Sequence, residues 1–181
     1  MYEVEVKVPA DLEAVRARLD GLEATATGAV VQADTYYDAP HRSFPETDEA
    51  LRIRTERLED DPDETRLTYK GPLVDDASKS REEVETAVGD GEKVDAVLTK
   101  LGFEPAATVR KERERFELEG YTITLDSVDD VGEYVEVETE VDDESELENA
   151  REGAFDVLER LGLDSDDQLR TSYLELLLES G

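Results

Sequence analysis

Charged side chains in this chain follow a two-residue spacing that could bring them together on one surface. Glu3 and Glu5 lie two positions apart, as do Arg52 and Arg54. More than half of the 20 Lys and Arg residues lie in less than a fifth of the chain, in segments 2–8, 50–57, 66–70, 81–85 and 109–116. Because alternate side chains of a β-strand share a face, these residues would form polar strand faces. Carboxylates can hold a divalent cation, and Arg and Lys can bind phosphate groups.

Acidic residues dominate the composition, with 50 Asp and Glu against 20 Lys and Arg in 181 residues and a net charge of −30. A field this negative repels phosphate backbones, so we expect no nucleic-acid partner. The chain has no cysteine, which excludes disulfides, thiolate nucleophiles and cysteine-bound zinc. Its one histidine, His41, excludes sites with several histidines. Any metal would therefore have oxygen ligands, which suits Mg²⁺, Mn²⁺ or Ca²⁺.

The hydrophobic segments are too short to cross a membrane, because none approaches the roughly 20 apolar residues that a span requires. The N-terminal segment also lacks a signal-peptide core. We therefore expect a cytoplasmic protein with no membrane partner. An excess of carboxylates with few lysines is typical of a halophilic protein, because molar salt screens the repulsion between surface charges. An acidic calcium-binding protein or a nucleic-acid mimic would be acidic too, but neither explains where the cations lie.

Alternation of apolar and polar residues predicts eight β-strands. In segment 2–8, Val4, Val6 and Val8 lie on one face and polar residues on the other. Similar runs predict strands at about 30–37, 50–58, 65–71, 81–88, 107–118, 121–127 and 133–141, with breaks at 60–64, 71–72, 89–91 and Gly120. Apolar residues at helical spacing predict helices over about 9–22, 92–102, 145–161 and 165–179, the last capped by Asp164 or Ser165.

These elements predict an α+β fold in one domain over residues 1–181, because no linker or low-complexity stretch divides the chain. If eight antiparallel strands close into a barrel, one face of each strand points into a common lumen, and helices can cover the apolar outer faces. The lumen would carry both signs of charge. Desolvating ions costs several kcal/mol each unless partners complete them, so a polyanion and a divalent cation are the ligands that such a lumen suits.

Eight short motifs follow one another along nearly the whole chain. They are Glu3-x-Glu5-x-Lys7, Asp34-Thr35-Tyr36-Tyr37-Asp38, Leu51-Arg52-Ile53-Arg54, Leu67-Thr68-Tyr69-Lys70-Gly71, Arg81-x-Glu83-x-Glu85, Lys111-x-Arg113, Leu125-Asp126 and Glu136-x-Glu138. In this order they resemble the motifs of the CYTH family, which comprises class IV adenylyl cyclases, thiamine triphosphatases and inorganic triphosphatases built as triphosphate tunnels. One such motif is weak evidence in an acidic protein, whereas eight in order make coincidence improbable.

The resemblance implies a role for particular residues. One or two Mg²⁺ or Mn²⁺ ions would be held by Glu3, Glu5, Asp126, Glu136 and Glu138. The triphosphate would be bound by Lys7, Arg52, Arg54, Lys70, Arg81, Lys111 and Arg113. Lys7, Arg113 and Asp126 would be the catalytic residues. Such cations would neutralise charge that develops on the transferred phosphorus and the leaving group.

Several residues have an alternative reading. Arg81 and Arg115 could simply pair with lumen carboxylates, and Arg57 and Arg66 are expected to lie outside the site. His41 lies in a polar loop and is expected to be exposed. Four tyrosines could stack on a base, although a place in the core is the favoured prediction: Tyr36, Tyr37, Tyr69 and Tyr173.

The substrate class is predicted better than the reaction. The motifs from Gln32 to Arg54 and the segment Ser172-Tyr173-Leu174-Glu175-Leu176 look more like class IV adenylyl cyclases than like thiamine triphosphatases. The resemblance therefore favours conversion of ATP to cyclic AMP and pyrophosphate, with a homodimer implied. Hydrolysis of inorganic tripolyphosphate or thiamine triphosphate is the alternative. A binding module that senses a nucleotide or polyphosphate without turnover stays open as well.

Overall fold

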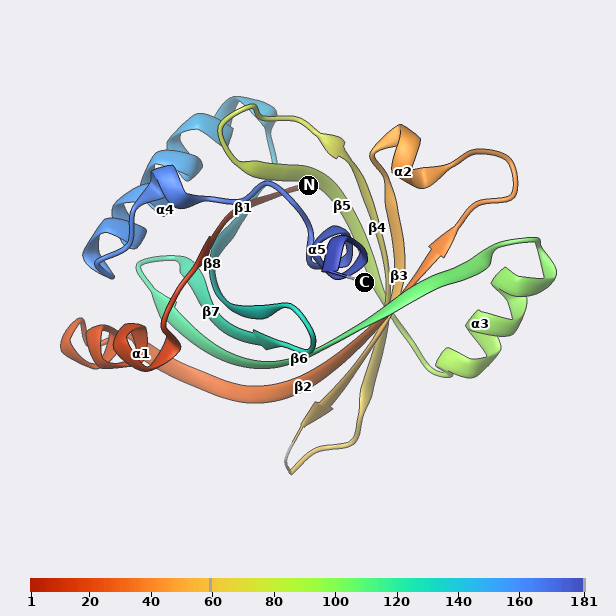
Figure 1. Cartoon of the computed structure of the whole chain (residues 1–181), viewed down its shortest axis with the longest axis horizontal. Helices are drawn as coiled ribbons and strands as arrows, with labels where there is room; N and C mark the ends of the chain where they lie inside the picture. Colours follow the sequence, from red (N-terminus) through yellow and green to blue (C-terminus); the bar gives the residue numbers. More distant parts are fainter. Residues whose placement is uncertain (59, 181) are drawn as a thin grey trace.

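In the computed structural model, which describes residues 1–58 and 60–180, eight strands form one closed antiparallel barrel. Neighbouring strands follow the order β1-β5-β4-β3-β2-β6-β7-β8. The strands are β1 (Tyr2–Pro9), β2 (Thr25–Asp38), β3 (Ala50–Leu58), β4 (Glu64–Leu73), β5 (Lys79–Val88), β6 (Glu104–Leu118), β7 (Tyr121–Val128) and β8 (Gly132–Val141). Figure 1 shows the barrel at the centre of the molecule with helices around it. The predicted α+β fold is confirmed.

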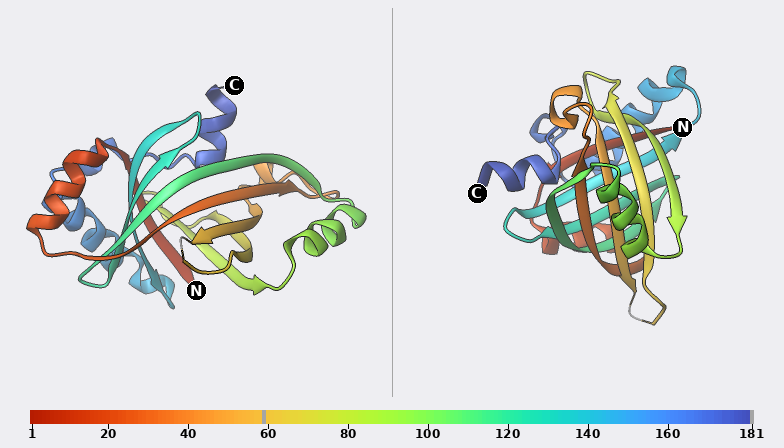
Figure 2. Two further views of the ribbon diagram at one scale, coloured as in Figure 1. Left: turned by 90° about the horizontal axis from the view of Figure 1, so that it is seen from below. Right: turned by 90° about the vertical axis from the view of Figure 1, so that its right-hand side faces the viewer.

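Helices cover one side of the barrel and lie at one of its openings. They are α1 (Leu12–Gly21), α2 (Phe44–Thr47), α3 (Gly91–Lys100), α4 (Leu147–Arg160) and α5 (Tyr173–Ser180), with 3-10 turns η1 (Glu144–Glu146) and η2 (Ser165–Asp167). In Figure 1, α1 and α4 lie outside the part of the barrel that contains β1 and β8. Figure 2 shows α5 projecting outward from the barrel. In the described part of the chain, no helix combines the length and apolar character that a membrane span needs.

The main hydrophobic core lies between the barrel wall and the helices α1 and α4. Val4, Val6 and Val8 of β1 point outward and are at most 1% exposed. The core cluster around Val6 and Val8 includes residues of α1 and α4, such as Leu19 and Leu158. Burying these faces removes about 25 cal/mol of unfavourable hydration per Å² of apolar surface. The alternation of residues in β1 therefore predicted correctly which face meets the helices.

The predicted helix over 165–179 is wrong in its first half. Residues 165–167 form the turn η2, with Asp164 as its cap, and α5 begins only at Tyr173. Between them the chain is extended, because its polar groups bind neighbouring strands and loops. Gln168 donates a hydrogen bond to the carbonyl of Ala77, and Arg170 donates to the carbonyls of Ser78 and Asp75. A helix would withdraw these side chains from their partners.

The predicted strand break at 71–72 is also wrong, because β4 continues through Pro72 to Leu73. The pairing with β5 shifts register between Lys70 and Leu73. Proline is tolerated in a sheet where an irregularity removes the need for its missing N–H. In addition, β2 and β6 begin earlier than predicted, at Thr25 and Glu104, and the short helix α2 occupies part of the loop around His41.

Candidate functional site

The inward faces of the strands enclose a cavity of about 860 Å³. Most of the predicted site residues line it: Glu3, Glu5, Arg52, Arg54, Lys70, Arg81, Lys111, Arg113, Glu136 and Glu138. They come from β1, β3, β4, β5, β6 and β8, so residues far apart in the sequence meet only because the barrel is closed. Two predicted residues, Lys7 and Asp126, do not line the cavity.

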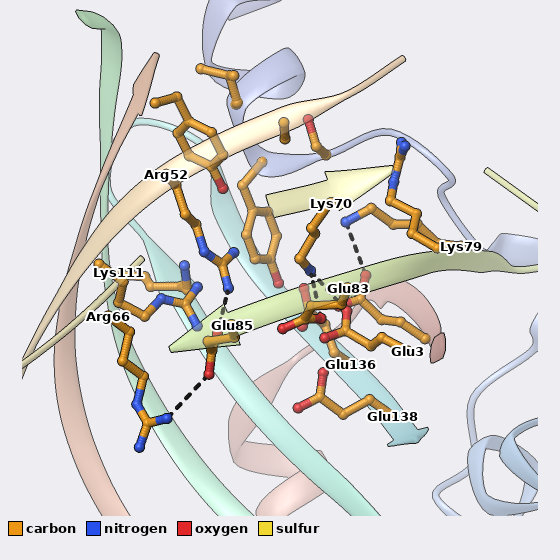
Figure 3. A pocket seen from close by; sticks show the side chains of 18 of the residues that line it. Glu3, Arg52, Arg66, Lys70, Lys79, Glu83, Glu85, Lys111, Glu136 and Glu138 are labelled. Atoms are coloured by element: carbon orange, nitrogen blue, oxygen red, sulfur yellow. Dashed lines mark hydrogen bonds and ion pairs between the residues drawn. The ribbon is translucent and has the colours of Figure 1, made fainter. Parts of the chain in front are cut away.

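Three carboxylates of β1 and β8 form a cluster on one side of the cavity. Glu5 lies opposite Glu138 in the strand register, and one carboxylate oxygen from each of Glu3, Glu5 and Glu138 lies within 4.8 Å of the others. Figure 3 shows Glu3 and Glu138 close to Glu136 and Glu83. This cluster gathers three of the five predicted metal ligands.

Burial and mutual repulsion shift the proton equilibria of these carboxylates. Burial, together with the charge of Glu3, raises the pKa of Glu138 to about 8. Burial and the neighbouring Glu5 raise the pKa of Glu136 to about 7. Although burial opposes it, the ammonium group of Lys70 lowers the pKa of Glu3 to about 2. At neutral pH Glu136 and Glu138 are therefore partly protonated, and a divalent cation beside them would favour their ionised forms.

The cluster fits a hard divalent cation. All its ligand atoms are carboxylate oxygens, the donors that Mg²⁺ and Mn²⁺ prefer. Glu83 Oε2 is buried, lies 3.7 Å from Lys70 Nζ and accepts no hydrogen bond in the described structure. Ammonium groups balance two of the carboxylates: Lys70 Nζ lies 2.8 Å from Glu3 and Lys79 Nζ lies 2.9 Å from Glu5. Which of the predicted ligands hold a metal stays a prediction.

The other two predicted metal ligands, Asp126 and Glu136, bind Arg113. Asp126 accepts two hydrogen bonds from the guanidinium group of Arg113, at 2.6 Å and 2.7 Å, and Glu136 accepts a third at 3.1 Å. These side chains are at most 6% exposed. The bidentate contact fixes the plane of the guanidinium group in the lumen.

Tyr173 at the start of α5 covers the two predicted residues that do not line the cavity. Its hydroxyl donates a hydrogen bond of 2.7 Å to Asp126, and the ammonium group of Lys7 lies 4.0 Å from the centre of its ring. Lys7 also donates to the carbonyl of Thr171 at 2.8 Å. Tyr173 is 6% exposed and lines the cavity. The prediction of a core position for this tyrosine thus overlooked a contact with the site.

Cations of β3, β4 and β5 extend along the cavity wall from the carboxylate cluster, and each has a carboxylate partner. Arg54 binds Asp34, Lys70 binds Glu3, and Arg81 binds Asp48. Figure 3 shows Lys70 and Lys79 pointing towards the carboxylates, with Arg52 and Arg66 on either side of Glu85. Arg81 also donates to the carbonyls of Gly71 and Asp48. The alternative role of Arg81 as an ion-pair partner is therefore consistent with its contacts.

Two expectations about peripheral arginines have different outcomes. Arg57 has a side chain that is 76% exposed and lies outside the cavity lining, as expected. Arg66 lines the cavity and binds Glu85 at 3.3 Å, so the expectation that it lies outside is wrong. Its position two residues before Thr68 on β4 gives it the inward face, a signal that the alternation already contained. Arg115 pairs with Glu56 at 2.5 Å.

Sequence reasoning gave no site role to several residues that the structure brings into or next to the lumen: Asp34, Glu56, Lys79, Glu83 and Glu85. Glu83 and Glu85 belong to a motif noted in the sequence, so their spacing was visible. Asp34 could have been found from its alternation with Gln32 and Tyr36 on β2. Nothing in the local sequence of Tyr173 indicates that it enters the lumen, because its position depends on the path of residues 168–172.

The two ends of the cavity differ in polarity. At the end near α2 and α5, the lining includes apolar or aromatic residues: Tyr36, Phe44, Pro45, Ala106, Leu174 and Leu178. At the other strand ends, the lining is charged or polar and includes Glu64, Arg66, Glu117, Thr122 and Glu140. A ligand with an apolar part would therefore find its apolar contacts at the end near α2 and α5.

Comparisons with known proteins agree with this arrangement. The model of the CYTH domain matches residues 1–173. A protein of Methanocaldococcus jannaschii named "Putative adenylate cyclase MJ0240" is 37% identical over 177 residues, which are 97% of this chain and 98% of that protein. "Adenylate cyclase CyaB" of Aeromonas hydrophila is 29% identical over 150 residues, covering 82% of this chain and 73% of that protein.

Solved structures share the barrel. The PH1819 protein of Pyrococcus horikoshii OT3 is 39% identical and superimposes with a TM-score of 0.92 over 99% of both chains. HpAC1 of Hippeastrum, for which a dominant triphosphatase activity is described, has a TM-score of 0.67 at 18% identity, with 98% of this chain and 95% of that chain covered. At this identity the second likeness concerns the fold alone.

Proposed function

Because this chain belongs to the CYTH family, we propose that it is a metal-dependent enzyme that acts on a triphosphate. The leading reaction is that of class IV adenylyl cyclases, in which ATP gives cyclic AMP and pyrophosphate. One observation carries the proposal: a cluster of carboxylates faces a group of buried Arg and Lys side chains across one cavity. A polyanion with a divalent cation satisfies both halves of this arrangement.

The cations would bind and orient the triphosphate. Arg52 and Arg54 offer planar donor groups that match phosphate oxygens, and Lys70 offers a point charge. These groups stand in place before the reaction, so charge that develops on the phosphates is stabilised without reorganisation. The carboxylates of Glu3, Glu5 and Glu138 would hold Mg²⁺ or Mn²⁺. When bound, such an ion neutralises phosphate charge and lowers the pKa of the attacking group.

The predicted catalytic residues would act in different ways. Arg113 lines the cavity and would contact the phosphate at which bonds change. Asp126 would orient Arg113 through its bidentate contact. Lys7 would reach the substrate once Tyr173 moves from its ring contact. The single histidine, His41, is exposed and does not line the cavity, so the proton lost by the attacking oxygen would pass to a lumen carboxylate.

The apolar end of the cavity favours an organic triphosphate over an inorganic one. A cavity of about 860 Å³ is in the range of about 300–1,000 Å³ typical of sites for organic ligands. A nucleoside could lie against Tyr36, Phe44 and Leu174 while its phosphates extend towards the cations. In the cyclase reaction the 3′-oxygen of ATP attacks the α-phosphorus, loses its proton, and pyrophosphate leaves.

Hydrolysis is the second candidate, because the charged end of the cavity suits access by water. Water would then attack the terminal phosphorus and orthophosphate would leave. The relevant lining residues include Glu117, Thr122 and Glu140. Non-catalytic binding of a nucleotide or polyphosphate is a third candidate. The homodimer that the resemblance implies stays a prediction.

Product analysis tests the proposal. Purified protein would be incubated with ATP, thiamine triphosphate or tripolyphosphate and Mg²⁺ or Mn²⁺, in KCl from about 0.2 M to about 3 M. Cyclic AMP with pyrophosphate is expected. Orthophosphate without cyclic AMP would assign hydrolysis instead, and tight binding without products would assign a binding module.

Matched variants test the site. We expect Glu138→Gln and Arg113→Ala each to lower turnover about 100-fold, because each removes a charge that faces the cavity. Glu112→Gln and Arg57→Ala are the controls, since both side chains are exposed and neither lines the cavity. Full turnover of every triphosphate by Glu138→Gln and Arg113→Ala would contradict the shared site.

A further inference from the structure

Asp34 of β2 is a fully buried carboxylate that holds cations from the strands on both sides of it. It is 0% exposed. Arg54 of β3 donates two hydrogen bonds to it, at 2.7 Å and 2.8 Å, and Lys111 of β6 donates another at 3.0 Å. Arg52 lies 4.0 Å from the same carboxylate. One carboxylate thus serves three cations, and positive charge remains in excess around it.

The three cations line the cavity, whereas Asp34 does not. Asp34 therefore lies behind them, in the wall of the barrel, and cannot itself contact a ligand in the cavity. The two hydrogen bonds from Arg54 fix the plane of its guanidinium group. Fixing Arg54 and Lys111 in advance reduces the entropy that phosphate binding would otherwise cost. An anion in the cavity would meet cations that already point towards it.

We propose that Asp34 is a positioning residue that assembles Arg52, Arg54 and Lys111 into a phosphate-binding group. This inference rests on the proposed function, because it concerns the recognition of the same triphosphate. The competing possibility is that Asp34 only neutralises buried charge so that the barrel can fold. The two possibilities differ in what they predict for ligand binding at different pH values.

The charge of Lys111 depends on the groups that face it from five elements. They are Asp34 on β2, Arg54 on β3, Arg113 on β6, Asp126 on β7 and Tyr173 on α5. Burial and the neighbouring arginines lower the pKa of Lys111 to about 7, and Asp34 is the stronger of the two carboxylates that oppose this shift.

Gln32, opposite Lys111 in the register, is uncharged, and neither of its amide atoms has a hydrogen-bond partner in the described structure. It therefore cannot replace the charge of Asp34. Loss of that charge would lower the pKa of Lys111 further, so Lys111 would lose its proton at a lower pH.

The first test measures tripolyphosphate binding by titration calorimetry from pH 6 to pH 9 without added Mg²⁺ at fixed KCl. We expect wild-type binding to weaken as the pH rises and Lys111 loses its proton. In Asp34→Asn this weakening should begin about one pH unit lower, and affinity at pH 7 should fall about tenfold. At each pH the ionisation of the ligand is the same for both proteins, and Lys7, Glu136 and Glu138 titrate in both, so the shift between the two pH profiles reports the charge of Lys111.

Two further variants separate positioning from folding. In Asp34→Asn combined with Lys111→Arg, the pH shift should disappear, because an arginine stays charged throughout this range. Glu56→Gln removes another buried carboxylate, the partner of Arg115. It should leave the pH at which binding weakens unchanged. A lower melting temperature in Asp34→Asn with an unmoved pH profile would overturn the proposal and leave a structural role only.

Asp34→Glu serves as a second variant, and triphosphate binding by the wild-type protein tests the proposed function separately. If Asp34→Asn does not fold, Asp34→Glu decides, because it keeps the charge but displaces the carboxylate. Binding about fivefold weaker at every pH is then expected, and unchanged affinity would contradict positioning. If the wild-type protein binds no triphosphate at any pH, the proposed function fails instead. Normal wild-type binding with no effect of the Asp34 variants overturns this inference alone.

Discussion

Two walls of the barrel contribute to the same cavity but are supported differently. The helix-backed wall, formed by β1, β6, β7 and β8, packs against α1 and α4 through a continuous core that includes Val6, Val137 and Leu158. The bare wall, formed by β3, β4 and β5, has no such continuous core in the described structure: α3 contacts β3, but Val84 on the outer face of β5 is 60% exposed. The first wall is therefore held by helix packing on its outer face as well as by strand pairing, and the second mainly by its strand pairing.

The predicted metal ligands are also distributed unequally between the two walls. All five predicted metal ligands lie on the helix-backed wall, on β1, β7 and β8. The bare wall carries no predicted metal ligand, and its cationic residues include Arg52, Lys70 and Arg81. A metal site demands fixed ligand positions, whereas cations that follow a flexible triphosphate tolerate more movement. We therefore expect the helix-backed wall to define the metal site and the bare wall to adapt to the substrate.

The largest expected effect concerns the core of the helix-backed wall. Leu158 of α4 is 0% exposed, so Leu158→Ala should lower the free energy of unfolding by about 3 kcal/mol. Leu101→Ala is the control, because Leu101 is 65% exposed and should change stability by less than about 0.5 kcal/mol. Urea unfolding at constant KCl measures both. Equal losses of unfolding free energy in Leu158→Ala and Leu101→Ala would contradict the stabilisation of the helix-backed wall by packing against α4.

Opposite effects on metal binding are expected from the two walls. Glu5→Gln should weaken binding of Mg²⁺ by about 30-fold, equivalent to about 2 kcal/mol, because it removes a carboxylate of the cluster. Lys79→Met should strengthen binding, because Lys79 of the bare wall competes for Glu5 at 2.9 Å. Calorimetry with Mg²⁺ alone measures both constants. Weaker binding in Lys79→Met would show that the bare wall supports the metal rather than competing with it.

A smaller effect is expected when pH is varied in the absence of metal. The pKa values of Glu136 and Glu138 are raised to about 7 and about 8 by burial and neighbouring carboxylates. The stability that follows from a raised carboxyl pKa is complete below the unfolded pKa and is lost as pH rises through the folded one. Stability should therefore fall by about 1 kcal/mol or more between pH 5 and pH 9.

Metal should reverse this trend, since a bound cation stabilises the ionised carboxylates. Thermal unfolding with and without Mg²⁺ would measure the difference, and stabilisation by Mg²⁺ should be larger at pH 9 than at pH 6. Stability without metal that rises over this range would contradict the assigned direction of the two shifts.

The smallest effect is expected on the outer face of the bare wall. Val84→Asp should change the free energy of unfolding by less than about 0.5 kcal/mol, because the side chain is already exposed. Urea unfolding and the oligomeric state in gel filtration would be measured together. A large loss of stability, or dissociation of an oligomer, would reveal that this face is covered in solution.

The alternation of residues was sufficient to predict the faces of the strands. Val4, Val6 and Val8 lie outward and Glu3 and Glu5 inward, as the two-residue period requires. The strand faces alone gave the closed barrel only as a condition, and the resemblance to the CYTH family implied the closure. Only the faces of the strands therefore follow from local pattern alone.

Contacts between distant segments were not predictable in the same way. The pairing of Asp34 with Arg54 follows from the strand register, which a single sequence does not specify. The start of α5 at Tyr173 follows from hydrogen bonds that residues 168–171 make to β1 and to the segment before β5. The helical spacing of Leu169, Tyr173 and Leu177 favoured a longer helix, and tertiary contacts overrode it.

The position of β1 in the barrel has a consequence for the order of folding. β1 pairs with β5 and with β8, so its partners lie about 75 to 140 residues further along the chain. Contacts this distant form slowly, because a long loop must close before they gain energy. Glu5 and Glu138 become neighbours only when β1 meets β8. Capture of a metal by the cluster would thus mark the closing event of folding, and the rate of capture would report how quickly a newly made chain completes its barrel.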